Sequence, residues 1–143
     1  MTTGRVTVVE AVMAAWARHD IDEILTHISP DIEWHYQVGS QPIRGRDNMR
    51  KMLERLESHQ LDSKWRLVRH GESENCVFIE AVDDYRNPDG HRVQAPYMGV
   101  YEFDGQTITA WRDYIDMGIM MKGEAGEALP EWLQELVDQG NEA

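Results

Sequence analysis

The chain has 143 residues, of which 41% are hydrophobic and 28% are charged, and its formal net charge is −12. A chain of this length usually forms one domain and buries enough surface for a core with a cavity. A field this negative repels phosphate backbones and anionic membrane surfaces, so we expect neither nucleic acid nor a membrane as a partner.

The residues that usually signal disulfides, metals or export are sparse. The single cysteine, Cys76, has no partner for an internal disulfide, and the six histidines do not stand at metal-ligand spacing. No run approaches the ~20 apolar residues of a membrane span. The N-terminal apolar stretch is interrupted by Glu10 and Arg18, unlike a secretory leader. We therefore expect a cytoplasmic protein without a metal site.

The first half of the chain predicts three helices and one strand. Apolar residues recur at helical spacing over residues 5–18, 20–28 and 47–58. Asp20 and Asp47 are the expected N-caps of the second and third helices, and Pro30 is expected to end the second. The alternation in "DIEWHYQV" then predicts a strand with one buried face.

From residue 64 the apolar period changes to two, which predicts strands. Four segments carry this alternation: residues 64–70, 76–86, 91–103 and 106–116. The short connections "GESEN", "NPDG" and "DG" are typical of hairpin turns. Successive strands are therefore expected to pair antiparallel.

The end of the chain is acidic and contains glycine. Residues 122–143 form a tail with one short amphipathic helix around Trp132 and Val137, which would pack on the body or on a partner subunit, or would fray. The preceding methionines, Met117, Met120 and Met121, are expected to form a soft lid or a contact between subunits.

The order of these elements predicts an α+β fold, in which a curved antiparallel sheet wraps around the N-terminal helices as a cone. The open end of such a cone is a natural pocket. We expect a single domain over residues 1–143, with 122–143 as its tail, and a homo-oligomer, either a dimer or a trimer.

Three motifs occur in a familiar order: "SPDIEW", "IRGRD" at the start of a helix, and "WRDYID" in the last strand. Over residues 5–121 the chain resembles the SnoaL-like group of the nuclear-transport-factor-2-like superfamily, and within it the limonene-epoxide-hydrolase-like enzymes. The resemblance implies a cystatin-like α+β roll. This fold carries isomerases, cyclases, hydrolases, lyases and binding modules, so it does not by itself define the reaction.

The comparison with the epoxide hydrolases implies roles for particular residues. "WRDY" places Asp113 at the aspartate that activates water, and "EAVDD" places Asp83 at the second aspartate. Ala81 stands where the family has an arginine between the two. Trp34 and Tyr36 stand where the family has a tyrosine and an asparagine that hold the water.

Ketosteroid isomerases are a second comparison, because "VGSQP" resembles a loop of that family. The positions of their three functional residues fall on Tyr36, Val12 and on or next to Met98. None of these residues can perform the corresponding role, so the comparison argues against that activity.

The residues themselves place a carboxylate beside an indole, since Trp111 and Asp113 share a strand face. On the strand over residues 76–86, both faces mix apolar and charged residues, and only the resemblance selects the face of Asp83. Two carboxylates in one apolar cavity share a proton, so one serves as base and the other as acid.

The candidate catalytic residues are Asp113, Asp83 and Tyr36. The candidate substrate-binding residues are Trp34, Trp111, Tyr97, Met98, Ala81, Tyr85 and Trp16.

The leading hypothesis is a cofactor-independent acid–base enzyme that acts on a hydrophobic, aromatic or terpenoid small molecule, with epoxide hydrolysis as the preferred reaction. One alternative is a cofactor-free lyase, isomerase or cyclase that abstracts a proton or cleaves a C–C bond. Another is a ligand-binding or assembly module without catalytic activity, which would leave Asp83 and Asp113 at the surface.

Overall fold

The computed structural model describes residues 4–141 and contains five helices and six strands in that range. The helices are α1 (Arg5–Ala17), α2 (Ile21–Thr26), α3 (Arg46–His59), α4 (Met117–Glu124) and α5 (Glu131–Val137). The strands are β1 (Ile28–His35), β2 (Ile43–Arg44), β3 (Leu61–Ser73), β4 (Cys76–Arg86), β5 (Arg92–Asp104) and β6 (Thr107–Ile115). None of the helices in this range is long and apolar enough to cross a membrane.

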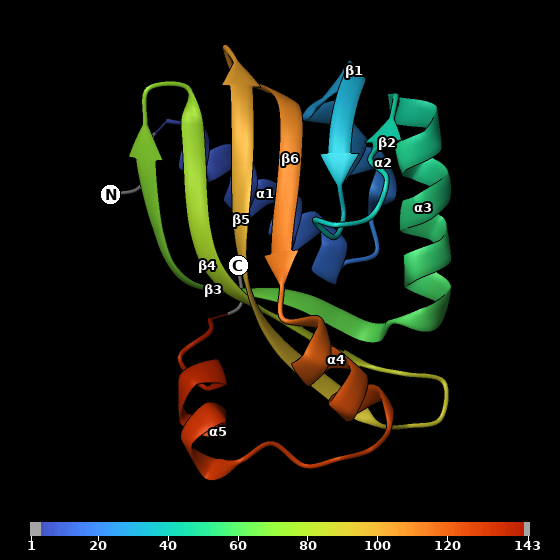
Figure 1. Cartoon of the computed structure of the whole chain (residues 1–143). Helices are drawn as coiled ribbons and strands as arrows, with labels where there is room; N and C mark the ends of the chain where they lie inside the picture. Colours follow the sequence, from blue (N-terminus) through green and yellow to red (C-terminus); the bar gives the residue numbers. More distant parts are fainter. Residues whose placement is uncertain (1–3, 142–143) are drawn as a thin grey trace.

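The strands form one curved, unclosed sheet in the order β2-β1-β6-β5-β4-β3 (Figure 1). Strands β3 to β6 pair antiparallel through short hairpins, as the alternation and the turns predict. The expected all-antiparallel sheet needs one correction, because β1 pairs parallel with β6. The chain leaves β1 and runs through β2 and α3 before it enters the meander, and a connection of this length allows a parallel neighbour. The α+β class is confirmed.

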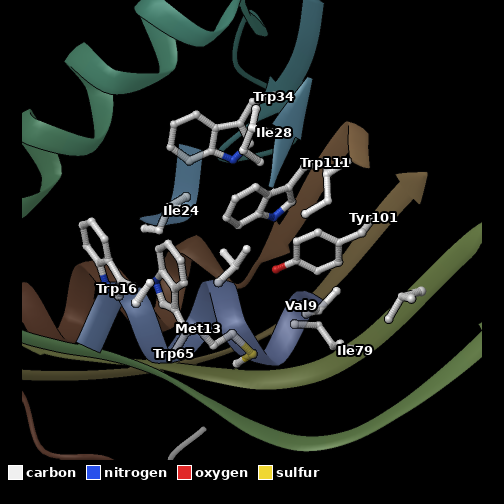
Figure 2. Packing of buried hydrophobic residues seen from close by; sticks show 14 of the residues in the cluster. Val9, Met13, Trp16, Ile24, Ile28, Trp34, Trp65, Ile79, Tyr101 and Trp111 are labelled. Atoms are coloured by element: carbon white, nitrogen blue, oxygen red, sulfur yellow. The ribbon is translucent and has the colours of Figure 1, made fainter. Parts of the chain in front are cut away.

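The concave face of the sheet packs on α1 and α2 through large aromatic side chains (Figure 2). The indoles of Trp16 and Trp65 are stacked, with ring centroids 4.6 Å apart. Trp65 also meets Trp111 edge to face at 5.6 Å, and Tyr101 lies 4.9 Å from Trp111 on the other side. These rings bury large apolar areas and hold the helices in the curve of the sheet.

Residues 81–85 of β4 are buried on both faces, which explains why the sequence alternation did not select one. Ile79 and Ala81 face the concave core. On the convex face, Val82 packs beneath Leu133 and Val137 of α5. The C-terminal tail therefore packs on the body of the same chain, and a backbone pairing of Leu67 with Asn141 holds its end.

Two helix boundaries differ from the sequence-based expectation. Helix α2 ends at Thr26, because Ile28 already belongs to β1 and pairs with Ile108 of β6. This pairing overrides the helical spacing of Ile28 in the sequence. Pro30 lies inside β1, at an irregularity of register where its missing N–H costs little. The N-cap of α3 is Gly45, and Asp47 lies in the first turn of the helix.

Helix α4 was not predicted from the sequence. It begins where Asp116 accepts a hydrogen bond from the backbone N–H of Ile119 at 3.1 Å, a typical N-cap. Met120 packs against Val93 and Ala95, so α4 covers the concave face of the sheet beyond the end of β6 (Figure 1).

Candidate active site

A cavity of about 180 Å³ lies between the concave face of the sheet, the C-terminal end of α3 and helix α4. The sheet contributes residues of β1, β3, β4, β5 and β6 to its wall. Its lining residues are Trp34, Tyr36, Gln37, Leu56, His59, Gln60, Trp65, Asp83, Tyr85, Tyr97, Asp113, Ile115, Met120 and Glu124. The cavity therefore stands where the cone of the sheet would open, and α4 closes part of that opening.

Asp113 projects into this cavity from β6 and is only 8% exposed. Its Oδ1 accepts a hydrogen bond from the indole Nε1 of Trp111 at 2.9 Å, as their shared strand face allows. Opposite it on β5 stands Gly99. A Cβ at that position would lie 3.0 Å from Oδ1 of Asp113 and 3.2 Å from Ile79, so the glycine provides the space for the carboxyl group.

Asp83 reaches the same cavity from β4 and is 6% exposed. Its Oδ1 is buried and has no hydrogen-bond partner among the residues that the structure describes. Burial, together with the negative charge of the neighbouring Asp84, raises the pKa of Asp83 to about 7. An unpaired buried carboxyl oxygen is costly, and it is a group that a ligand in the cavity can satisfy.

The two carboxyl groups act on each other. Burial raises the pKa of Asp113 well above its usual value; the Trp111 hydrogen bond opposes this shift, and the charge of Asp83 adds to it. Two such groups titrate as a pair, so the pair holds one proton over a range of pH above about 7. The indole hydrogen bond favours the anion on Asp113, and the unpaired oxygen favours the proton on Asp83.

Aromatic side chains form the wall between these carboxyl groups and the core. Trp34 lies 5.4 Å from Trp111 and 5.9 Å from Tyr36, measured between ring centroids, so one run of rings follows β1 and β6. Tyr97 is buried and lines the cavity from β5. Burial, with the charges of Tyr101, Asp113 and Asp83, raises its pKa, so its hydroxyl stays protonated and can donate a hydrogen bond.

A second polar cluster lies in the same cavity. Tyr85 of β4 donates a short hydrogen bond through its hydroxyl to Oε1 of Glu124 in α4. The same oxygen is 3.0 Å from Nε2 of His59 at the end of α3, and Oε2 accepts from the side-chain amide of Asn87 at 2.8 Å. Three elements that are distant in the sequence therefore meet at one carboxylate.

The structure brings most of the expected site residues together. Asp113, Asp83, Tyr36, Trp34, Tyr97 and Tyr85 line the cavity. Trp111 contributes through its hydrogen bond to Asp113.

Three expected substrate-binding residues lie elsewhere. Trp16 lies in the core, where its Nε1 donates to Ser63 at 2.7 Å. Met98 is 52% exposed, because it points to the convex face of the sheet. Ala81 is fully buried opposite Tyr97 and does not line the cavity.

Several lining residues had no signal in the sequence. His59 and Gln60 stand at the end of α3, Glu124 at the end of α4, and Trp65 on β3. Polar residues are common at helix ends and do not recur at a regular spacing, so the sequence pattern did not identify His59, Gln60 or Glu124 as site residues. Trp65 lies in the segment 64–70, whose alternation predicted a strand but did not identify Trp65 as a site residue.

A larger hollow, of about 410 Å³, lies on the convex face. Its central carboxylate, Asp84, is paired with Arg66 at 2.9 Å and with Arg92 at 2.7 and 3.0 Å. These charged groups already satisfy one another, as in a structural ion-pair network. Among the described residues there is no group of three or more side chains that would hold a metal ion.

The geometry defines a class of protein: an α+β roll whose cavity holds two buried aspartates beside aromatic rings. Residues 3–125 match the family model described as the limonene-1,2-epoxide hydrolase catalytic domain. The chain belongs to this family, and it is an enzyme of the epoxide-hydrolase type.

Individual relatives agree with this assignment. The chain is 32% identical over 116 residues to the epoxide hydrolase EphG of Mycobacterium tuberculosis (strain ATCC 25618 / H37Rv), covering 80% of this chain and 75% of the relative. A solved structure of an M. tuberculosis LEH-like epoxide hydrolase superposes with a TM-score of 0.75 at 30% identity, over 94% of this chain and 95% of the other. A SnoaL-like protein of Shewanella denitrificans has a TM-score of 0.78 at 14% identity over 86% and 98%, which shows the shared fold.

Proposed function

We propose that this protein hydrolyses an epoxide of a hydrophobic small molecule to a vicinal diol, and that Asp113 and Asp83 carry the acid–base chemistry. The observation that supports it most strongly is the convergence of two buried carboxyl groups on one cavity, one anchored by an indole N–H and the other with an unpaired oxygen. The family and the named activity of its relatives support the same reaction.

The proposed reaction uses the single proton that the pair holds. Asp113, as the anion, removes a proton from a water molecule, and the water oxygen attacks one epoxide carbon. The C–O bond breaks as Asp83 donates its proton to the departing oxygen. A proton then passes from Asp113 to Asp83, which restores the pair. Each general acid or base step of this kind contributes about 10²–10⁴-fold to the rate.

The attacking water needs hydrogen-bonding groups that orient it. The cavity offers the hydroxyls of Tyr36 and Tyr97 and the side-chain amides of Gln37 and Gln60. Tyr36 stands at one of the two positions where the family has its water-holding residues. We propose that it and the nearby amides hold the water, and that Tyr97 donates a hydrogen bond to the epoxide oxygen.

The aromatic wall favours a substrate with a ring. Trp34, Tyr36, Trp65 and Tyr97 all line the cavity, and rings of this kind stack on aromatic ligands. We therefore expect aryl epoxides to be better substrates than small terpene epoxides. Fast, selective hydrolysis of a small terpene epoxide with no turnover of aryl compounds would contradict this expectation.

The test is a panel of aryl and terpene epoxides with the wild-type protein and with Asp113→Asn, which is nearly isosteric. The variant is expected to lose at least 10²-fold in kcat, because the general base is removed. Asp89→Asn, an exposed change of the same chemistry, is the matched control and keeps wild-type rates. Retention of more than about a tenth of the activity by Asp113→Asn would contradict the role of Asp113.

A lyase, isomerase or cyclase reaction is the second candidate, and the protonated Tyr97 hydroxyl beside two carboxyl groups favours it. These groups would also suit proton removal from carbon beside a carbonyl. Water labelled with ¹⁸O separates the two reactions. Hydrolysis places one labelled oxygen in the diol, whereas a lyase, isomerase or cyclase places none in its product.

A further inference from the structure

The polar cluster of Tyr85, Glu124 and His59 lies in the cavity but takes no part in the reaction proposed above. Tyr85 is almost completely buried, and the Glu124 side chain is 29% exposed. Partial burial alone would raise the pKa of Glu124, but the hydrogen bonds from Tyr85, Asn87 and His59 outweigh it and lower the pKa. The carboxylate is therefore a fixed negative charge at one end of the pocket.

The hydrogen bonds of this cluster are directed inward, toward Glu124. An ionised carboxylate only accepts, so Tyr85 must donate its O–H, and His59 and Asn87 must each donate an N–H. These donors are used up by the carboxylate. The groups left to meet a ligand are acceptors: the hydroxyl oxygen of Tyr85 and the remaining lone pair of Oε2 of Glu124.

The charge of the cavity also favours a ligand that donates hydrogen bonds or is positively charged. Asp83, Asp113 and Glu124 contribute three carboxyl groups, and no lysine or arginine is present among the lining residues of the described chain. The whole chain adds a formal net charge of −12. An anionic ligand would be repelled here, whereas the faces of Trp34 and Trp65 attract cations.

Strand β4 contributes one residue to each group, Asp83 to the reacting pair and Tyr85 to the polar cluster. Asp83 and Tyr85 stand two residues apart on the same face of β4, which separates them by roughly 7 Å. That separation suits the two ends of a para-substituted benzene ring. Oδ1 of Asp83, a residue that lines the same cavity, is buried and has no hydrogen-bond partner among the described residues, so it is a group that a ligand can satisfy.

We infer that the substrate is an aryl epoxide with a hydrogen-bond donor, a hydroxyl or a protonated amine, at the end of the ring opposite the epoxide, and that Tyr85, Glu124 and His59 select it. This inference rests on the proposed epoxide hydrolysis. Glu124 accepts the donor while Asp83 and Asp113 act on the epoxide. Carboxylate-bearing and wholly apolar analogues lack that interaction.

The kinetic test compares styrene oxides that carry a para-hydroxymethyl, a para-methyl or a para-carboxylate group. The wild-type protein is expected to favour hydroxymethyl over methyl by about tenfold in kcat/KM, the worth of one hydrogen bond to a charged acceptor, and to disfavour the carboxylate. Glu124→Gln and Tyr85→Phe should bring the hydroxymethyl-to-methyl ratio close to one. Glu127→Gln, an exposed change of equal charge just beyond α4, should leave the ratio unchanged.

A binding test separates this inference from the reaction. The unreactive aryl diols with para-aminomethyl, para-methyl and para-carboxylate groups are titrated calorimetrically into the wild-type protein and Glu124→Gln. Tighter binding of the aminomethyl diol, lost in Glu124→Gln, supports the inference even if no epoxide is hydrolysed. Equal binding of the aminomethyl and methyl diols, preference for the carboxylate, or a preference that survives Glu124→Gln would overturn it, even if epoxides are hydrolysed.

Discussion

Asp113 lies in one of the most apolar parts of the molecule, and its immediate neighbours explain how it is accommodated. Trp111 supplies one hydrogen bond, and Gly99 leaves the volume that the carboxyl group occupies. A single neutral donor does not replace the hydration of a carboxylate, so burial raises the pKa of Asp113. In the proposed mechanism, this raised pKa lets the pair keep a proton at neutral pH.

The raised pKa predicts a pH-dependent loss of stability. Between the ordinary pKa of Asp113 and its higher native value, the native state binds more protons than the unfolded state, so the free energy of unfolding falls as pH rises. Asp113→Asn removes this penalty. We expect the variant to be more stable than the wild type by about 1–2 kcal/mol at pH 8 and to differ little near pH 3, below the ordinary pKa of an aspartate.

Urea denaturation at the two pH values measures this difference. Asp89→Asn, on the surface, serves as the control and should behave as the wild type at both. If Asp113→Asn proved less stable than the wild type at pH 8, Asp113 would be a structural anion and not a group buried at a cost.

At the scale of elements, local pattern predicted the strands well and the helix ends less well. The bounds of β4 follow from its alternation and from turns on both sides. Helix α4 escaped prediction because "MGIMMKGE" contains two glycines and no polar face, and its cap, Asp116, reads as the end of a strand. Its position comes from packing against β5, which no local pattern encodes.

The residues of the candidate site also fall into those that local sequence pattern could assign and those that it could not. Asp113 could be assigned from strand parity, because Trp111 marks its buried face. Asp83 needed the family resemblance, since α5 covers the other face of β4 and both faces carry apolar and charged residues. His59 and Glu124 reach the cavity only because α3 and α4 end there, and the meeting of two helix ends is a tertiary event.

The packing of α5 depends on one buried arginine. Arg66 pairs with Asp84 at 2.9 Å and donates to the backbone carbonyls of Val137 and Gly140 at 3.0 and 2.8 Å. Arg66→Met leaves these acceptors buried and removes one of the two guanidinium groups that pair with Asp84. We expect a loss of about 3–5 kcal/mol in the free energy of unfolding, as for other broken buried pairs.

The matched control is Arg69→Met on the same strand. Arg69 is 69% exposed and pairs with Glu80 at 2.7 Å, so its loss is expected to cost less than about 1 kcal/mol. Chemical denaturation compares the two variants. Equal stability of the two would show that Arg66 does not hold the C-terminal helix.

On the scale of the whole molecule, one cavity lies between the curved sheet and the ends of α3 and α4. We propose that Asp83 and Asp113 carry the acid–base chemistry in this cavity and that Glu124 supplies a fixed negative charge beside them. The aromatic core of Figure 2 supports the wall of this cavity. In our account, the pair of aspartates reacts with the substrate and Glu124 selects it.

The central claim is that Asp83 and Asp113 share one proton near neutral pH. Carbon-13 NMR of the aspartate carboxyl groups measures this directly, with Asp83→Asn and Asp113→Asn to assign the two signals. The account predicts that the pair loses a proton near pH 7, and that kcat/KM for an aryl epoxide rises over the same range, because the base must be ionised. Two carboxyl groups that are both fully ionised at pH 5 would contradict it.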